Sequence, residues 1–195
     1  MRELPPLTTK RLVLRMPQPA EWEVPLRYHK KNAEHLAQSG PLYPADFFEP
    51  AYWQKRLSAS LEEFQQDKSA RLYIYLRTGD GDEFVDDIIG SANLSDILRR
   101  AAQFCYLGYG LAADAQGHGY MSEAIERVVR FGFEELNLHR IMANYMPSNK
   151  RSGNVLKSVG FVEEGIARDY LYLKGSWQDH VLTSITNAHW RPDRA

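Results

Sequence analysis

The chain has 195 residues, of which 44% are hydrophobic and 25% charged, so its apolar side chains can offset the entropy cost of folding. This composition excludes an intrinsically disordered protein and predicts a single folded domain. The 24 Lys and Arg are balanced by 25 Asp and Glu, so we expect no direct nucleic-acid readout.

Cysteine content and the first residues indicate the cellular compartment. Cys105 is the only cysteine, which excludes an internal disulfide framework and a cysteine-rich zinc site, and it lies mid-strand among aromatic residues as a core thiol would. The segment Met1–Pro6 lacks the apolar stretch of a signal peptide, and no run reaches the roughly 18 apolar residues of a membrane span. We therefore expect a cytoplasmic protein without membrane contact.

The first half of the chain predicts strands and two helices. Prolines end a short alternating segment, and Trp53, Leu57, Leu61 and Phe64 recur at three- and four-residue spacing, as on one helix face. The turn-forming run 78–82 predicts a hairpin between the two β-rich segments. The expected elements are a strand at 10–15, helices at about 20–38 and 50–66, and strands at 71–76 and 85–94.

The second half alternates strands and helices. A helix of about five turns begins near Gly117 and Gly119, and a second one is closed by Gly160 in the C-cap position. The remaining expected elements are strands at 103–111, 139–146, 161–173 and 177–189 and a helix at 149–159. This order predicts one mixed α/β (α+β) domain over 1–195, with its core at about 7–190.

The segment 111–121 is the most informative one for chemistry. A strand ends there, a turn with two glycines follows, and a helix starts. A helix N-terminus offers unpaired N–H groups and a partial positive charge, and glycines let a ligand approach that backbone, so a phosphate or pyrophosphate fits. A tight turn that uses glycines only for their φ angles is the alternative. The turn matches neither a P-loop nor the three-glycine dinucleotide fingerprint, which disfavours ATP and NAD.

At these residues the chain resembles a known family. The stretch Gln116–Met121 resembles the Gln/Arg-x-x-Gly-x-Gly/Ala signature of the GCN5-related N-acetyltransferases (GNAT), although Met121 departs from the final small residue. The segment 137–153 is similar to the RimJ type within this superfamily, the ribosomal-protein alanine N-acetyltransferases. The likeness extends over about 7–190, so it covers nearly the whole chain.

The resemblance implies a GNAT fold and a co-substrate, acetyl-CoA. The fold is a mixed sheet of about seven strands, splayed between strands 4 and 5 and flanked by about four helices. The pantetheine arm pairs with the fourth strand. Asn149 forms a hydrogen bond to this arm or serves as a plain helix N-cap. The six histidines show no metal-chelating spacing with a third ligand, so we expect no metal. The implied cofactor-binding residues are Tyr109, Gly110, Leu111, Gln116, Gly117, His118, Gly119, Tyr120, Met121, Ser122 and Asn149.

Amide formation from a thioester requires a base for the amine and a proton for the departing thiolate. The resemblance implies Asp169 as the base, directly or through water, and a solvated strand-end aspartate is the alternative. The tyrosine that many members use as the acid is replaced by Leu156. Ser152 fits the serine of the ribosomal-protein branch, where its hydroxyl either donates the proton or only stabilises the thiolate.

The expected function is transfer of acetyl from acetyl-CoA to the N-terminal alanine of a ribosomal protein, small-subunit protein uS5, by direct attack in a ternary complex. The partners would be the N-terminal peptide of that protein and the small ribosomal subunit. Two alternatives stay open. The acceptor can be another amine, such as a lysine, a polyamine or an antibiotic, or the chain can be a non-catalytic ribosome-assembly or regulatory protein that senses acetyl-CoA.

Overall fold

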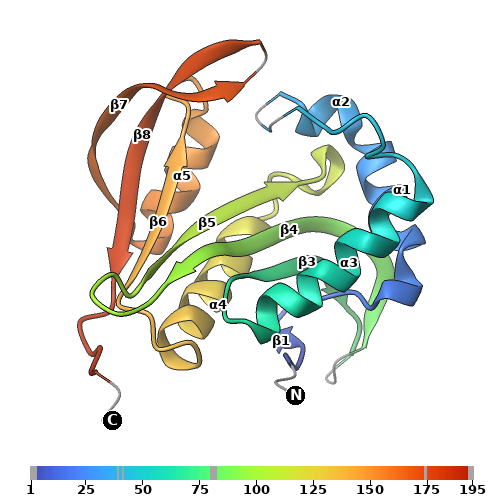
Figure 1. Ribbon diagram of the computed structural model, residues 1–195, viewed down its shortest axis with the longest axis horizontal. Helices are drawn as coiled ribbons and strands as arrows, with labels where there is room; N and C mark the ends of the chain where they lie inside the picture. Colours follow the sequence, from blue (N-terminus) through green and yellow to red (C-terminus); the bar gives the residue numbers. More distant parts are fainter. Residues whose placement is uncertain (1–3, 39, 41, 80–82, 174, 193–195) are drawn as a thin grey trace.

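A computed structural model describes residues 4–38, 40, 42–79, 83–173 and 175–192 of the chain, and Figure 1 shows their arrangement around one sheet. The sheet has eight strands in the order β1-β2-β3-β4-β5-β6-β8-β7. The strands are β1 (Leu7–Thr8), β2 (Leu12–Arg15), β3 (Ala70–Arg77), β4 (Phe84–Leu98), β5 (Phe104–Leu111), β6 (Arg140–Tyr145), β7 (Val162–Leu173) and β8 (Ser176–Thr186). The helices are α1 (Glu23–Lys31), α2 (Ala33–Leu36), α3 (Pro50–Gln65), α4 (Tyr120–Glu134) and α5 (Lys150–Val159), with 3-10 turns at Pro19–Glu21 and Ala113–Ala115.

Two elements differ from the sequence prediction. The two-residue β1 pairs with β2 and adds an eighth strand to the seven expected, so the expected fourth and fifth strands are β5 and β6. The expected helix at 20–38 is two helices, because Asn32 leaves the helical conformation at φ -109° and its side-chain Nδ2 donates to Tyr28 O at 2.9 Å. Residues 80–82 of the expected hairpin turn and Lys174 of the later turn lie outside the described residues.

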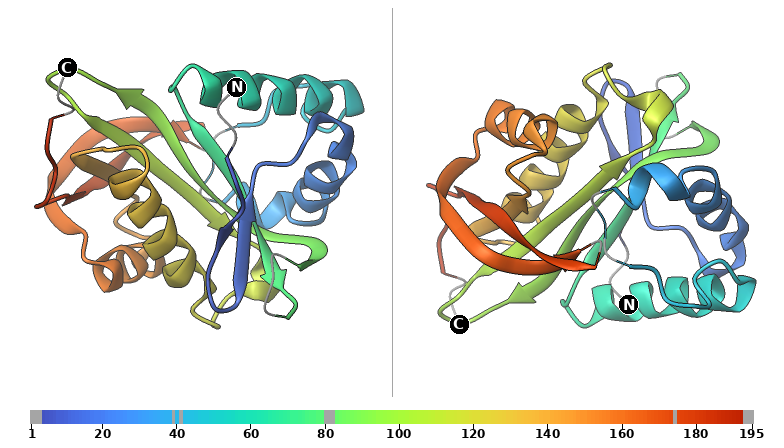
Figure 2. Two further views of the ribbon diagram at one scale, coloured as in Figure 1. Left: turned by 90° about the horizontal axis from the view of Figure 1, so that it is seen from below. Right: turned by 90° about the horizontal axis from the view of Figure 1, so that it is seen from above.

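Helices cover both faces of the sheet. Figure 2 shows α4 and α5 on one face and α1 to α3 on the other. The spacing that predicted the α4 helix is confirmed, because its apolar stripe is the part of the helix that packs into the main core. A Cβ placed on Gly132 would lie 2.8 Å from Ile141 Cδ1, so a side chain there would require Ile141 to shift. The buried residues of that stripe are Met121, Ala124, Ile125, Val128, Val129, Phe131 and Gly132. Among the described residues, no helix is both long and apolar enough to cross a membrane.

The sheet opens between β5 and β6, as expected. These two strands are parallel and pair only where Phe104–Tyr106 faces Arg140–Met142; beyond that point they diverge in the V seen in Figure 1. On its other side β5 pairs with β4 in an antiparallel register, and Ala112 N donates to Ile89 O. Because such hydrogen bonds alternate along a strand, the N–H and C=O groups of Tyr109 and Leu111 point into the opening. An amide-bearing ligand can pair with them there.

Candidate active site

Two cavities meet at the opening of the sheet. The first, here called the glycine-loop cavity, has a volume of about 830 Å³ and lies against residues 116–122, α5 and the end of α2. The second, here called the sheet cavity, has a volume of about 780 Å³ and lies over β3 to β6 between α1, α3 and the β7–β8 hairpin. Six residues line both: Leu36, Tyr109, Gly110, Met146, Asn149 and Ser152. A group held at these residues can therefore contact ligands in both cavities.

The structure brings together nearly all the residues expected to bind the cofactor. Those that line the glycine-loop cavity are Tyr109, Gly110, Leu111, Gln116, Gly117, Gly119, Tyr120, Met121, Ser122 and Asn149. His118 is the exception, because its ring stacks on Tyr120 at a centroid distance of 5.4 Å and does not line the cavity.

The glycine loop presents backbone donors to its cavity. Gly117 and Gly119 have φ angles of 85° and 74°, a region that side chains with a Cβ rarely adopt. Gly119 is the N-cap of α4 and no side chain caps the helix, so the N–H groups of its first turn have no partner within the helix. A Cβ placed on Gly117 would have no neighbour within 4 Å. The loop therefore offers an open surface of donors that suits a phosphate or pyrophosphate.

Arg11 braces this loop from the N-terminal segment. Its Nη1 donates to His118 O at 2.9 Å, and its Nε donates to Glu123 Oε2 at 2.6 Å. Burial raises the pKa of Glu123, but the hydrogen bonds from Thr9 and Arg11 lower it by more, so this pKa lies below its usual value. The carboxylate near the start of α4 is thus paired with a cation. No local sequence pattern points to Arg11, because it lies 107 residues from its loop partner.

A second group missed by the sequence analysis is His35 of α2. Its Nε2 lies 3.1 Å from Leu111 O, one of the carbonyls that point into the opening, and 2.9 Å from Gln116 Nε2. Gln116 also accepts a hydrogen bond from Arg151, whose side chain lines the same cavity. These contacts connect α2, the end of β5 and the first turn of α5 around the glycine-loop cavity.

A pair of hydroxyl groups stands where the two cavities meet. Tyr109 Oη and Ser152 Oγ are 2.6 Å apart, and Ser152 N donates to the side-chain Oδ1 of Asn149 at 3.2 Å, so Asn149 is the N-cap of α5. Burial raises the pKa of Tyr109 to about 12, so its phenol keeps its proton at neutral pH. Tyr109 Oη also lies 3.2 Å from Ser152 O, to which its phenol can donate. When the phenol donates to Ser152 Oγ instead, the Ser152 proton is available to a third partner. Leu156, at the position of the superfamily's tyrosine, is buried in the core.

Comparison with known proteins decides the family. The family model described as an acetyltransferase (GNAT) domain matches residues 11–162. The chain belongs to the GNAT acetyltransferases.

The relatives of this GNAT enzyme include acetyltransferases that are named for ribosomal proteins. The chain is 41% identical over 189 residues to the ribosomal protein uS5-alanine N-acetyltransferase of Escherichia coli, covering 96% of this chain and 94% of that protein. The ribosomal-protein-S5-alanine acetyltransferase of Vibrio fischeri gives a TM-score of 0.88 at 33% identity, covering 96% of this chain and 99% of that one. RimJ of Mycobacterium smegmatis, solved in complex with CoA-disulfide, gives a TM-score of 0.80 at 26% identity. This match covers 90% of this chain and 81% of that one.

The donor of a GNAT enzyme is acetyl-CoA, and the glycine-loop cavity has the groups that this molecule needs. Its diphosphate matches the N–H groups after Gly119, and its pantetheine amides match the backbone groups of Tyr109 and Leu111 that point into the opening, where Leu111 O also lies 3.1 Å from His35 Nε2. Among the described residues, no three His, Cys, Asp or Glu side chains are grouped as ligands for a metal ion.

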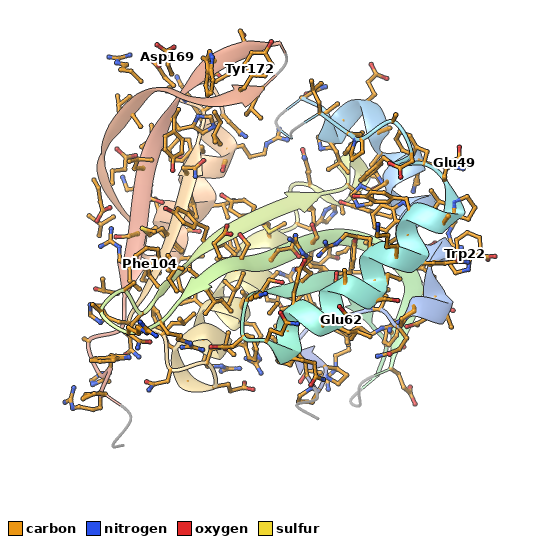
Figure 3. All side chains as sticks on the ribbon, viewed as in Figure 1. Trp22, Glu49, Glu62, Phe104, Asp169 and Tyr172 are labelled. Atoms are coloured by element: carbon orange, nitrogen blue, oxygen red, sulfur yellow. The ribbon has the colours of Figure 1, made fainter. Side chains whose placement is uncertain are left out.

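Asp169 lies outside the two cavities of the candidate GNAT site. It is exposed on β7 at φ 47°, within the irregular pairing between Ala167 and Leu171, and its N–H donates to Asp179 Oδ1 at 3.0 Å. It lines neither cavity, whereas its neighbours Tyr170 and Leu171 line the sheet cavity. Figure 3 shows Asp169 and Tyr172 at the free end of the β7–β8 hairpin, far from Phe104 at the closed end of the V.

Two further side chains have structural roles in this GNAT fold. Cys105 is fully buried, and burial raises the pKa of its thiol to about 12, so it is an inert core residue as the sequence predicts. Arg99 is half-buried, where its Nη2 donates to Asp67 Oδ1 at 2.6 Å and its Nη1 donates to Leu136 O at 2.7 Å. Its guanidinium therefore stabilises the fold and is not part of a binding surface.

Proposed function

We propose that this GNAT enzyme transfers the acetyl group of acetyl-CoA to the N-terminal alanine of ribosomal protein uS5, in the cytoplasm and by direct attack in a ternary complex. One observation carries the proposal: the two cavities meet at the Tyr109–Ser152 pair, so a donor in one and a peptide terminus in the other would face each other there. The 41% identity to the enzyme that modifies uS5 extends over 96% of the chain and supports this acceptor.

The proposed acceptor amine suits a site with weak bases. An α-amine has a pKa of about 8 and a lysine amine one of about 10.4, so removing the proton of the α-amine near neutral pH costs about 3.3 kcal/mol less. An extended peptide can also use main-chain hydrogen bonds for affinity and side-chain packing for selectivity. The sheet cavity offers strands on its floor and the β7–β8 hairpin on its wall for such a peptide.

We assign the residues of the glycine-loop cavity to the donor. The loop from Gln116 to Ser122 would hold the diphosphate with its backbone N–H groups, and Tyr109 and Leu111 would pair with the pantetheine amides. Asn149 caps α5 through its Oδ1, which leaves its amide N–H groups available to the pantetheine side. When bound, acetyl-CoA supplies an activated acyl group, and the chain positions that group and manages the protons.

We propose Ser152 as the residue that stabilises the departing sulfur, with Tyr109 donating to Ser152 Oγ. The variant Ser152→Ala removes a hydrogen bond to a charged group, worth about 1.5 to 3 kcal/mol, so kcat should fall about 10- to 100-fold. The affinity for acetyl-CoA should change little, and Tyr109→Phe should show a smaller loss. Single-turnover kinetics with Ser58→Ala, an exposed serine of α3, as control tests this. An unchanged rate in Ser152→Ala would remove the residue from the chemistry.

We propose Asp169 as the base. It is exposed and directly precedes Tyr170, which lines the sheet cavity, so we expect its carboxylate to act on the amine through a water molecule. The position on the hairpin that walls the acceptor cavity supports this role.

The acceptor class is tested with a panel of amines. Purified enzyme and acetyl-CoA are incubated with a peptide that begins with alanine, with spermidine and with an aminoglycoside, and the products are identified by mass spectrometry. The peptide should have the highest kcat/KM, with one acetyl group on its terminus. Preference for spermidine or the aminoglycoside would assign another amine class. Acetyl-CoA binding without transfer to any amine would favour the sensor alternative.

A further inference from the structure

Two arginines line the sheet cavity on the side away from the Tyr109–Ser152 pair. Arg56 comes from α3 and Arg71 from β3, and both contact the same oxygen of Glu63, with Arg56 Nη2 at 2.8 Å and Arg71 Nε at 3.1 Å. Glu63 does not line the cavity, so it holds the two guanidinium groups from behind. Each guanidinium carries five N–H donors, and Glu63 takes one nitrogen of each. Donors of both arginines thus remain for a ligand.

The surroundings of the two arginines favour an anion. Tyr52 lies one helical turn before Arg56 on α3, lines the same cavity, and adds a phenol donor. Burial raises the pKa of Tyr52, the charges of Arg56 and Arg71 lower it, and the charge of Asp46 raises it, so the phenol keeps its proton. Asp96 is an acidic residue on the cavity wall, but it is exposed to solvent. The side chains of Arg56 and Arg71 are only 25% and 37% exposed, so their charges are less screened than those of surface arginines.

The strand register fixes how far these arginines lie from the reacting end of the site. Arg71 pairs with Asn93 on β4, and Asn93 pairs with Gly108 on β5, next to Tyr109. Neighbouring strands are about 4.8 Å apart, so Arg71 lies about 10 Å across the sheet from Gly108. A Cβ placed on Gly108 would have no neighbour within 4 Å, and Asn93, which lies between the two places, accepts a hydrogen bond from Leu72 N through its Oδ1 at 3.0 Å. An extended peptide advances about 3.3 Å per residue and covers this distance in about three residues.

We propose that Arg56 and Arg71 form a carboxylate subsite that selects acceptor peptides with an Asp or Glu side chain at their third or fourth residue. The inference rests on the proposed terminal-amine acceptor and adds a sequence preference to it. Arginine suits this role because its planar fork of N–H groups matches a carboxylate.

The test compares peptides that begin with alanine, have amidated C-termini and differ at one position. Glu or Gln is placed in turn at residues 2 to 5, and kcat/KM is measured for each pair. For the wild-type enzyme, Glu should be preferred over Gln by about tenfold at residue 3 or 4, as for a charge-assisted hydrogen bond, and the preference should shrink in high salt.

Variants of the enzyme connect the preference with the two arginines. Arg71→Gln and Arg56→Gln should each bring the Glu/Gln ratio towards one, and Arg71→Lys should keep part of it. Arg130→Gln, which removes an exposed arginine of α4, should keep the wild-type ratio. Equal kcat/KM for Glu and Gln peptides in the wild type, with acetylation still on the terminus, would overturn the subsite and leave the proposed function standing. Absence of terminal acetylation in every peptide would overturn both.

Discussion

The variant Gly119→Glu should lose acetyl-CoA affinity by about 100-fold or more. Gly119 lines the glycine-loop cavity and caps α4, and a Cβ there would lie 3.6 Å from Arg11 Nη2. The added carboxylate would stand where an anion must bind and would compete for the cation that braces the loop. Two like charges about 4 Å apart repel by about 4 kcal/mol at an effective dielectric constant of 20, enough for this loss. Titration calorimetry with acetyl-CoA measures it.

Gly119→Ala is the matched control for this variant. Any L residue at φ 74° costs about 1 to 2 kcal/mol of stability, so both variants carry the same backbone strain, but only glutamate adds charge and length. Gly119→Ala should therefore bind acetyl-CoA far more tightly than Gly119→Glu. A folded Gly119→Glu protein with wild-type affinity would show that the diphosphate is bound elsewhere.

The second large effect is expected from Asp169→Asn, which keeps the shape of the side chain and removes its capacity to accept a proton. General bases contribute roughly 100- to 10,000-fold to turnover, and an exposed carboxylate that works through water belongs at the lower end, so kcat should fall about 100-fold. The affinity for acetyl-CoA should not change.

Asp86→Asn is a suitable control for this variant, because Asp86 is an equally exposed strand residue, on β4, and does not line the sheet cavity. It should keep wild-type kcat. If Asp169→Asn behaves in the same way, the amine loses its proton to solvent or to another group of the sheet cavity.

The parts of the site that depend on local sequence could be predicted from the sequence. The apolar period of α4 depends on residues close in the sequence and matches the expectation. The positive φ angles of Gly117 and Gly119 are also a local feature, which the alternative of a tight glycine turn predicts. Asn149 as the N-cap and Gly160 as the C-cap of α5 are local features of the same kind. Because such features need no knowledge of the rest of the fold, the glycine loop could be located before the structure was known.

The parts that depend on distant pairing could not be predicted in this way. His35 meets Leu111 across 76 residues and Arg11 meets His118 across 107, and only the packing of the N-terminal helices and strands against the end of β5 brings them together. Arg56 and Arg71 are brought together by their shared contact with Glu63 and by the strand register, neither of which a local sequence pattern shows. Asp169 is placed by an irregular strand pairing with a positive φ angle, which departs from the simple alternation that a sequence pattern implies.

Acetylation of a terminal α-amine is tested most directly with one pair of peptides. Both carry the N-terminal sequence of uS5 from the same organism with a lysine further along, and one has its α-amine blocked by a formyl group. Mass spectrometry with fragmentation locates the acetyl group after incubation with enzyme and acetyl-CoA. The account predicts one acetyl group on the terminal alanine of the free peptide and no product from the blocked one. Equal acetylation of the blocked peptide on its lysine would contradict it.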